Sequence, residues 1–385
     1  MAHASPTPRS RTAAVVLAGF CAFLTIYAPQ PLLPALAQDF HVPAALIALA
    51  MTATTAGIGL AAPFIGMLSD RVGRKRVIVP SALLLAIPAT LTSTATSLHS
   101  LLMWRFLQGI FAPGVAAVTI AYINEEWESG AGAAMSAYVT GTVFGGFSGR
   151  TIAAFIAFHG SWRWAFATLG ILNAVGALAM AVWLPADRHV PHPAARNSMA
   201  AHLRNSSLLA TCAVGFCVLF TLIATFTYVN FYLAAPPFSL STRALGLLFT
   251  VYLLGVVVTP LVGGYIDRLG HRAAIAIAFT GCMAGISLTL IRALPSVILG
   301  LALLSTGVFI AQAVTSSFIG IAARQAHASA VGLYSVFYYA GGTLGSALPG
   351  WFWTHGGWPA CVALIIVVTA MTIVIAWFTW RPAAR

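Results

Sequence analysis

The sequence predicts an all-α membrane protein whose twelve transmembrane helices form two pseudo-symmetric six-helix bundles. Three observations lead to this prediction. The composition is far more apolar than that of a water-soluble domain, the apolar residues occur in runs of about twenty, and the second half of the chain repeats motifs of the first half in the same order.

The composition argues against a water-soluble fold. Of the 385 residues, 60% are hydrophobic and only 7% are charged, whereas soluble domains carry roughly 25% charged residues. The mean hydropathy is +0.92. A bilayer favours the exposure of apolar side chains, but every backbone polar group must then be satisfied within a helix or a closed barrel. The apolar runs are too long for alternating barrel strands, so helices are predicted.

Apolar windows long enough to cross a bilayer define twelve predicted spans. They are residues 12–36, 44–68, 77–96, 98–122, 131–157, 162–184, 207–233, 244–266, 273–292, 295–321, 328–353 and 358–380. The first span follows Arg9 and Arg11 as a secretory signal would, but it lacks a small-residue cleavage pattern. It is therefore expected to remain as the first transmembrane helix.

The basic residues predict the orientation, because cytoplasmic loops are enriched in Lys and Arg. With both termini in the cytoplasm, Arg163, Arg243 and Arg292 are the basic residues at the outer face. The inner segments then hold Arg9, Arg11, Arg71, Arg74, Lys75, Arg76, Arg188, Arg196, Arg204, Arg268, Arg272, Arg324, Arg381 and Arg385. The net charge of +12 is therefore explained by topology, and no nucleic-acid partner is expected.

The domain boundary is predicted at the longest polar stretch. Residues 185–206 contain Pro, His and Arg without apolar periodicity, so they are expected to form a cytoplasmic linker. The linker separates an N-terminal bundle, residues 1–184, from a C-terminal bundle, residues 207–385.

The two halves repeat each other at a distance of about 200 residues. The paired segments are 66–76 with 263–272, 158–162 with 354–358, and Tyr138, Gly141 and Gly145 with Tyr338, Gly341 and Gly345. Because six spans is an even number, both copies have the same orientation. Two such halves usually enclose a substrate site at their interface.

The motifs resemble those of a known family. Residues 66–76, GMLSDRVGRKR, resemble the G-x-L-[AS]-D-R-x-G-R-[KR] signature between the second and third helices of the major facilitator superfamily. Residues 104–109, WRFLQG, resemble the R-x-x-Q-G motif of helix four, which is common in proton-coupled antiporters. The resemblance covers essentially the whole chain. Further segments, 26–34, 145–150 and 162–164 among them, are similar to the YnfM-type branch of exporters, within the drug:proton antiporters.

Helix five departs from the antiporter pattern. That pattern reads G-x-x-x-G-P-x-x-G-G, and Gly141, Gly145 and Gly149 fit it. Gly146 stands in place of the proline and Arg150 in place of the final glycine. The proline kink is therefore absent, whereas the small residues still permit close helix packing.

The loop signature predicts a conformational latch on the cytoplasmic side. Asp70 is expected at the N-terminus of the eleventh helix, where a carboxylate is stabilised, and Arg74 within reach of a carboxylate that ends helix four. Gly66 and Gly73 would permit close helix approach and a tight reversal. The alternative is a solvated turn that only sets topology. The residues assigned to the latch are Gly66, Asp70, Arg71, Gly73, Arg74, Glu125, Glu126, Asp267 and Arg268.

Two arginines are predicted inside the membrane. Arg105 and Arg150 each lie about 10 Å from the outer end of their helix, where an arginine is costly unless it faces a cavity or a partner. One interpretation is a site for an anionic substrate group, which a planar guanidinium can grip with two hydrogen bonds. The other is snorkelling, or hydrogen bonding to the carbonyls of a broken helix. Asp39 is the sole acid on the outer side, and Asp39 and Arg105 are assigned to proton coupling.

Other polar residues near mid-depth are candidates to line a substrate cavity. Each could equally make a hydrogen bond between helices. With Arg105 and Arg150, the predicted substrate-binding residues are Tyr27, Gln30, Gln108, Tyr138, Asn230, Tyr252, Gln312 and Tyr338.

The resemblance implies a secondary active transporter that moves a small organic solute by alternating access, with proton-coupled export favoured. The alternative is a carrier of small organic anions or sugars, in uptake or exchange, that uses the intramembrane arginines. No catalytic nucleophile with its base, metal cluster or Walker-type loop is evident, so neither an enzyme nor a cofactor is expected. The protein is expected to be a monomer that spans the bacterial inner membrane many times, with both termini cytoplasmic.

Overall fold

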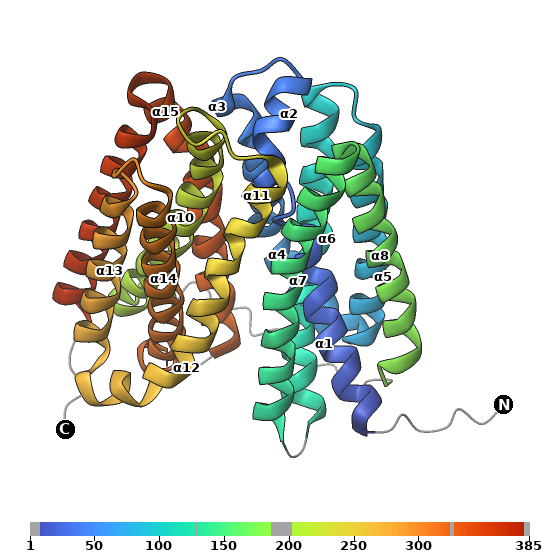
Figure 1. Cartoon of the computed structure of the whole chain (residues 1–385). Coiled ribbons are helices and arrows are strands. Elements are labelled where there is room, and N and C mark those ends of the chain that lie inside the picture. Colours follow the sequence, from blue (N-terminus) through green and yellow to red (C-terminus); the bar gives the residue numbers. More distant parts are fainter. Residues whose placement is uncertain (1–7, 128–129, 186–201, 324–326, 381–385) are drawn as a thin grey trace. The chain divides into compact units, whose positions relative to one another are not determined.

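The chain folds into helices grouped in two compact units. The computed structural model describes residues 8–127, 130–185, 202–323 and 327–380 (Figure 1). Unit 1 comprises residues 1–40 and 53–194, and unit 2 comprises residues 41–52 and 195–385. The predicted linker, 185–206, lies mostly outside the described residues.

Unit 1 contains six spans, the first of which is broken. Its elements are α1 (Pro8–Leu24), η1 (Gln30–Leu32), α2 (Leu33–Asp39), most of α4 (Leu49–Val72), α5 (Lys75–Leu91), η2 (Thr92–Thr94), α6 (Leu98–Glu126), α7 (Ala131–His159) and α8 (Trp162–Trp183). Residues 25–29 between α1 and η1 are not helical. Pro29 lies in this break, and Pro31 and Pro34 follow it. Each of them lacks the N–H that helical hydrogen bonding requires.

Unit 2 repeats the plan with an unbroken first helix. Its elements are α3 (Ala44–Ile47), α10 (Ser206–Ala234), α11 (Thr242–Leu247), η3 (Leu248–Thr250), α12 (Val251–Leu269), α13 (His271–Leu288), α14 (Leu294–Ala322) and α15 (His327–Thr379). The last element contains two helices joined at Gly357, which has a φ of 59°. Residues 328–353 and 358–380, predicted as separate spans, lie on either side of this kink.

The all-helical membrane fold predicted from the sequence is confirmed. Within the described ranges, nine helices are long and apolar enough to cross a membrane. The kinked α15 counts once among these and holds two predicted spans. The remaining predicted spans correspond to the broken α1 and to α7, which has 29 residues. All twelve predicted spans therefore have helical counterparts.

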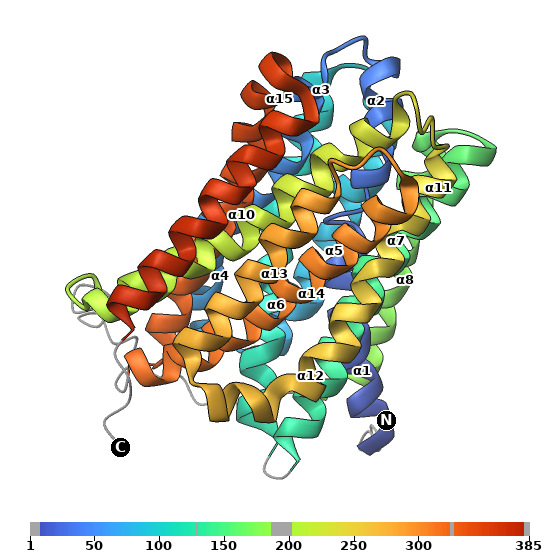
Figure 2. The same cartoon turned by 60° about the vertical axis from the view of Figure 1, so that its left-hand side comes forward.

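Glycines set the closest helix contacts in both units. A Cβ atom at any of these glycines would collide with the backbone of the neighbouring helix, so only glycine permits the approach. The contacts pair Gly141 with Val16, Gly145 with Phe20 and Gly149 with Leu24 in unit 1, and Gly341 with Phe216 and Gly345 with Phe220 in unit 2. Figures 1 and 2 show α10 beside the first part of α15. The repeat thus extends from sequence motifs to individual contacts.

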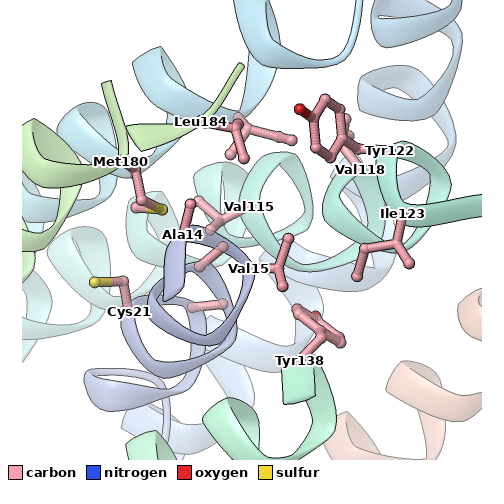
Figure 3. Packing of buried hydrophobic residues seen from close by; sticks show 14 of the residues in the cluster. Ala14, Val15, Cys21, Val115, Val118, Tyr122, Ile123, Tyr138, Met180 and Leu184 are labelled. Carbon is pink, nitrogen blue, oxygen red and sulfur yellow. The ribbon is translucent and has the colours of Figure 1, made fainter. Parts of the chain in front are cut away.

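An apolar cluster joins several helices of unit 1. Val15 of α1, Tyr122 of α6, Tyr138 of α7 and Leu184 after α8 are buried in it (Figure 3). Its rim is polar, because Lys75 Nζ donates to the Leu184 carbonyl and Tyr122 Oη donates to the Pro185 carbonyl at 3.2 Å. These bonds satisfy carbonyls that the C-terminus of α8 would otherwise leave unpaired.

Residues 41–52, predicted within the N-terminal bundle, pack with unit 2 instead. Thr52 Oγ1 and Ser346 Oγ are 2.8 Å apart, and the Ser346 carbonyl accepts a bond of 2.9 Å from Tyr228 Oη. A Cβ at Gly350 would lie 3.0 Å from the Cβ of Ala45. Because Gly350 has no side chain, α3 can pack closely against α15.

The glycine contact between α1 and α7 predicts a stability difference. Gly145→Ala should destabilise unit 1 by about 1–3 kcal/mol, because the added methyl group collides with the Phe20 backbone. Gly132→Ala in the same helix is the matched control, since a Cβ there meets no described atom within 4 Å. Thermal unfolding of the purified proteins in detergent measures both. Equal melting temperatures for the two variants would contradict the packing.

Candidate substrate site and charged network

The break in the first helix is held by Arg105. This side chain is fully buried in α6, and its Nη1 donates to the Thr25 carbonyl at 3.0 Å. Its Nη2 donates to the Ile26 carbonyl. Both carbonyls belong to the turn in which α1 ends, where helical hydrogen bonding stops. Of the two interpretations of Arg105, the structure shows the one in which a broken helix supplies backbone carbonyls.

Gln108 extends this network toward α5. Its Oε1 accepts a hydrogen bond from Arg105 Nη1, while its Nε2 donates to the Pro88 carbonyl at 3.1 Å and to Thr92 Oγ1 at 2.8 Å. Pro88 and Thr92 lie where α5 passes into η2. The Arg105–Gln108 pair therefore ties two irregular helix ends to the N-terminal part of α6, and Gln108 is satisfied by protein atoms.

Arg150 forms a second polar cluster on the other side of the break. Its Nε donates to Gln30 Oε1 at 2.8 Å and its Nη1 to the Gly146 carbonyl at 2.7 Å. The guanidinium carbon lies 4.9 Å from the centre of the Tyr27 ring, a cation–π distance. The side chain of Arg150 is only 3% exposed and that of Gln30 is fully buried. Three predicted site residues, Tyr27, Gln30 and Arg150, are thus brought together.

The Gln30 amide has a buried atom without a partner. Its oxygen must face Arg150, because a guanidinium N–H can only donate. The Nε2 group, which carries two donor hydrogens, then has no partner among the described residues. The hydroxyl of Thr25 is likewise buried and without a partner. Burial of an unmatched donor is costly, so these atoms mark a place where an acceptor is missing.

Unit 2 lacks both arginines at the corresponding positions. The α14 helix has the same number of residues as α6, and the places of Arg105 and Gln108 are taken by the buried Leu301 and Leu304. Because Gly141 and Gly145 of α7 correspond to Gly341 and Gly345 of α15, Arg150 corresponds to Gly350. The two polar clusters therefore belong to the broken helix of unit 1 alone.

Three of the remaining predicted lining residues contact another helix, whereas Tyr338 packs on a residue of its own helix, α15. Tyr138 donates to the Ala116 carbonyl at 2.9 Å, and Gln312 accepts from Tyr334 at 3.2 Å. Tyr338 stacks on Tyr334 with ring centres 5.8 Å apart. The Tyr252 ring packs edge-on against Phe226 and Phe309. Tyr138 and Gln312 therefore make hydrogen bonds between helices, as the alternative interpretation describes, while Tyr252 and Tyr338 make ring contacts.

Asn230 is a buried amide like Gln30, but its unpartnered atom in the described part of the chain is the oxygen and not the nitrogen. It is fully buried in α10, and its Nδ2 donates to the Phe226 carbonyl at 2.6 Å. The Oδ1 atom has no partner among the described residues. By the glycine contacts, Asn230 takes the place in α10 that Gln30 takes after α1. The repeat thus keeps a buried amide at this position. Within the residues that the structure describes, the atom without a partner is the acceptor oxygen in Asn230 and the donor nitrogen in Gln30.

Asp39 is paired with other residues at the end of α2. Its Oδ2 lies 3.5 Å from Arg163 Nη1 and accepts a hydrogen bond of 2.9 Å from Trp162 Nε1. Half of the Asp39 side chain is exposed. The contacts of Arg105 and Arg150 given above are with neutral oxygens and an aromatic ring, so Asp39 is placed with Arg163.

The charged network of unit 1 is centred on Arg74. Its Nε and Nη2 donate to the two oxygens of Glu125 at 2.9 and 2.5 Å, and its Nη1 donates to Asp70 at 2.5 Å and to Ser69 at 2.6 Å. The contact that the sequence predicted between Arg74 and the end of helix four is therefore present. The bond to Glu125 raises the pKa of Arg74, burial lowers it, and Asp70 raises it further.

Not every residue assigned to the latch joins this network. The close helix approach expected at Gly66 is wrong for the described residues, since a Cβ there meets no atom within 4 Å. Its carbonyl instead accepts a bond of 2.9 Å from Ser69. The tight reversal is confirmed, because Gly73 has a φ of 101°, and its repeat counterpart Gly270 one of 80°.

The remaining latch residues lie at helix ends. Arg71 and Arg268 are exposed in the last turns of α4 and α12. The carbonyl of Glu126 accepts a bond of 3.0 Å from Arg11 Nη2, whose guanidinium also covers the Trp127 ring at 4.6 Å. Asp267 belongs to α12, but its side chain is outside the described part of the structure.

Sequence reasoning missed several contributors to these clusters. Ser69 supports Arg74 and Thr92 supports Gln108 through their side chains. The others act through backbone carbonyls, which leave no residue-type signal: those of Thr25, Ile26, Pro88 and Gly146. The sequence does carry a signal for Gly146. Gly146 and Arg150 are the two departures of helix five from the antiporter pattern, and one hydrogen bond joins them.

The fold and these clusters define a class of protein. Two repeated six-helix units, with a broken helix that places polar groups inside a span, are the arrangement of membrane transporters. The Major Facilitator Superfamily sequence pattern matches residues 15–236 and 217–385. The chain therefore belongs to the Major Facilitator Superfamily and is a secondary transporter.

Known proteins resemble the chain over nearly its whole length. The inner membrane transport protein YnfM of Escherichia coli K12 is 33% identical over 369 residues, which is 94% of this chain and 88% of YnfM. The MFS-type transporter YybF of Bacillus subtilis 168 is 30% identical over 381 residues, 97% of this chain and 94% of YybF. A crystal structure of the nucleoside transporter NupG, D323A mutant, has a TM-score of 0.79 and 14% identity, and covers 96% of this chain and 98% of its own.

The Arg74 network predicts unequal roles for Glu125 and the exposed Arg71. Glu125→Gln should destabilise unit 1 by about 1 kcal/mol, a modest value because the Glu125 side chain is 40% exposed. Arg71→Gln should have a smaller effect, because Arg71 is exposed in the last turn of α4. Thermal unfolding of the purified variants compares the two. A larger loss for Arg71→Gln would show that the network is centred elsewhere.

The position of Arg105 predicts a structural loss. Arg105→Leu introduces the residue that unit 2 carries at this place, but it leaves the Thr25 and Ile26 carbonyls without their donor, at about 1–3 kcal/mol for each group. The exposed Arg292 provides the control, Arg292→Leu. The melting temperature should fall by about 5 °C or more for Arg105→Leu and little for the control. A wild-type melting temperature for Arg105→Leu would refute this role.

Proposed function

We propose that the chain exports a small organic solute by alternating access and that proton entry drives the export. The observation that carries the proposal is the broken first helix of unit 1. It brings Tyr27, Gln30 and Thr25 into the interior of a span, where polar groups mark transport pathways. Export and proton coupling are further supported by the resemblance of the Arg105–Gln108–Gly109 motif to that of proton-coupled antiporters.

Asp39 is the proposed proton acceptor. It ends α2, the short helix that follows η1, so it belongs to the same segment as Gln30. Protonation would remove its charge and release Arg163, which also donates to the Ala95 carbonyl at 3.1 Å. The half-exposed carboxylate can exchange protons with water. Arg105 contributes by holding the carbonyls of the break in place while Asp39 changes charge.

The setting of this transport is also proposed from the sequence. The loop charges support an orientation with both termini in the cytoplasm, and the similarity to an inner membrane protein supports the bacterial inner membrane. The chain is proposed to act as a monomer on a small-molecule substrate.

A second candidate is a carrier of small organic anions or sugars that works by uptake or exchange. The observation that favours it is Arg150, whose charge is held by the neutral oxygens of Gln30 and Gly146. A carrier of this kind needs no proton acceptor. Solute exchange in the absence of a pH gradient would favour it over proton-coupled export.

Reconstituted vesicles separate the two candidates. The purified protein is placed in liposomes with a pH-sensitive dye inside, loaded in turn with organic anions, a cationic dye, a neutral drug or a sugar, and the outside is acidified. For the transported solute, we expect solute efflux together with acidification of the lumen.

Asp39 provides the internal control for this assay. Asp39→Asn should abolish proton entry because the ionisable group is lost, whereas Asp39→Glu should retain it. Efflux that proceeds equally in Asp39→Asn, or that never moves protons, would reject proton coupling at this residue and leave the exchange carrier.

A further inference from the structure

Two departures of helix five from the antiporter pattern form one structural feature. Arg150 stands where the pattern has glycine, and its Nη1 donates to the carbonyl of Gly146, which stands where the pattern has proline. A Cβ at Gly146 would lie 3.3 Å from this same Nη1. Gly146 therefore supplies both an acceptor and the room that the guanidinium needs.

The guanidinium is fixed in direction by its contacts. Gln30 Oε1 holds Nε at 2.8 Å, the Gly146 carbonyl holds Nη1 at 2.7 Å, and the Tyr27 ring lies beside its face at 4.9 Å. A fixed guanidinium loses little conformational freedom when it binds a ligand. These restraints suit a binding group better than a side chain that reaches freely for the membrane surface.

The elements of this cluster bring a positive charge and no acid. None of the seven acidic residues of the sequence lies in α1, η1 or α7. The nearest acid along the chain is Asp39, which ends α2 and contacts Trp162 and Arg163. Burial of a cation is costly, and an anionic ligand would place an opposite charge beside this guanidinium.

The unpartnered Gln30 Nε2 lies on the same amide that holds Arg150. Because Oε1 and Nε2 are bonded to one carbon, the amide donors are adjacent to the guanidinium. The buried Thr25 hydroxyl is a second group near the break without a partner among the described residues. A charged donor next to a neutral amide donor matches a monoanion with two oxygens in one plane. A carboxylate has this shape, and its pairing with guanidinium is strong and directional.

We propose that Arg150 and Gln30 form a binding subsite for the carboxylate of a small organic monoanion, which is the group by which the transported solute is recognised. The identification of this ligand as the transported solute rests on the proposed function. Arg105 is excluded from the subsite, because the carbonyls of Thr25 and Ile26 and the amide of Gln108 hold its guanidinium.

The test uses purified full-length protein and matched ligands. Aromatic and aliphatic carboxylates, such as benzoate, phenylacetate, cinnamate and octanoate, are compared with the neutral amide and the amine of the same skeleton by calorimetry. The wild type should bind at least one carboxylate about tenfold or more tightly than its amide, and should bind the amine no better than the amide. This comparison needs no variant and so does not depend on how substitutions fold.

Three variants locate the subsite. Arg150→Lys keeps the charge but loses the planar fork, and Gln30→Met keeps the volume but loses the amide donor. Each should weaken carboxylate binding, by about tenfold for Arg150→Lys and less for Gln30→Met, with little change for the amide. Arg292→Gln, an exposed arginine in neither cluster, should bind as the wild type does.

Several results would overturn the subsite. They are the absence of carboxylate binding to the wild type, equal affinity for carboxylate and amide, tighter binding of the amines, or a carboxylate preference that survives in Arg150→Lys and Gln30→Met. The proposed function fails separately, when a carboxylate binds with the expected preference but does not cross the vesicle membrane in the transport assay.

Discussion

The hydrogen bonds from Arg105 to the carbonyls of Thr25 and Ile26 are the constraint on which the rest of unit 1 depends. A helix that ends inside a membrane exposes carbonyls that lipid cannot satisfy. Arg105 satisfies two of them from α6, and Gln108 connects the same guanidinium to the end of α5. With the break fixed in this way, Tyr27 and Gln30 take positions beside α7 that a continuous helix would not give them.

The comparison of the two units shows what the break requires. In unit 2, α10 is continuous over 29 residues and contains no proline, so its carbonyls are bonded within the helix. Leu301 and Leu304 occupy the places of Arg105 and Gln108, since no carbonyl needs a donor there. Gly350 occupies the place of Arg150 and leaves room for Ala45. The duplicated framework, set by glycine contacts, has therefore been kept while the polar groups have diverged.

Much of the fold could be predicted from the sequence, because long apolar runs and a repeated motif are direct consequences of the membrane and of duplication. The pairing of Arg74 with Glu125 could also be predicted, since a signature motif fixed one partner and the end of a span fixed the other. The partners of Arg105 and Arg150 could not, because they include backbone carbonyls at a helix break. The first span was predicted as one continuous helix over residues 12–36, because its three prolines do not show at which residue the helix ends. The docking of α3 on α15 was also unpredictable, since a helix of four residues has no periodicity to read.

The placement of the cysteines has a practical meaning for thiol chemistry. All five, Cys21, Cys212, Cys217, Cys282 and Cys361, are buried and unpaired, each within an apolar helix. Maleimide reagents react with thiolates that water can reach, so the natural chain should react very little with them. A single cysteine introduced at an exposed position would then carry the whole signal, and probes of topology and motion could be attached without first removing the native thiols.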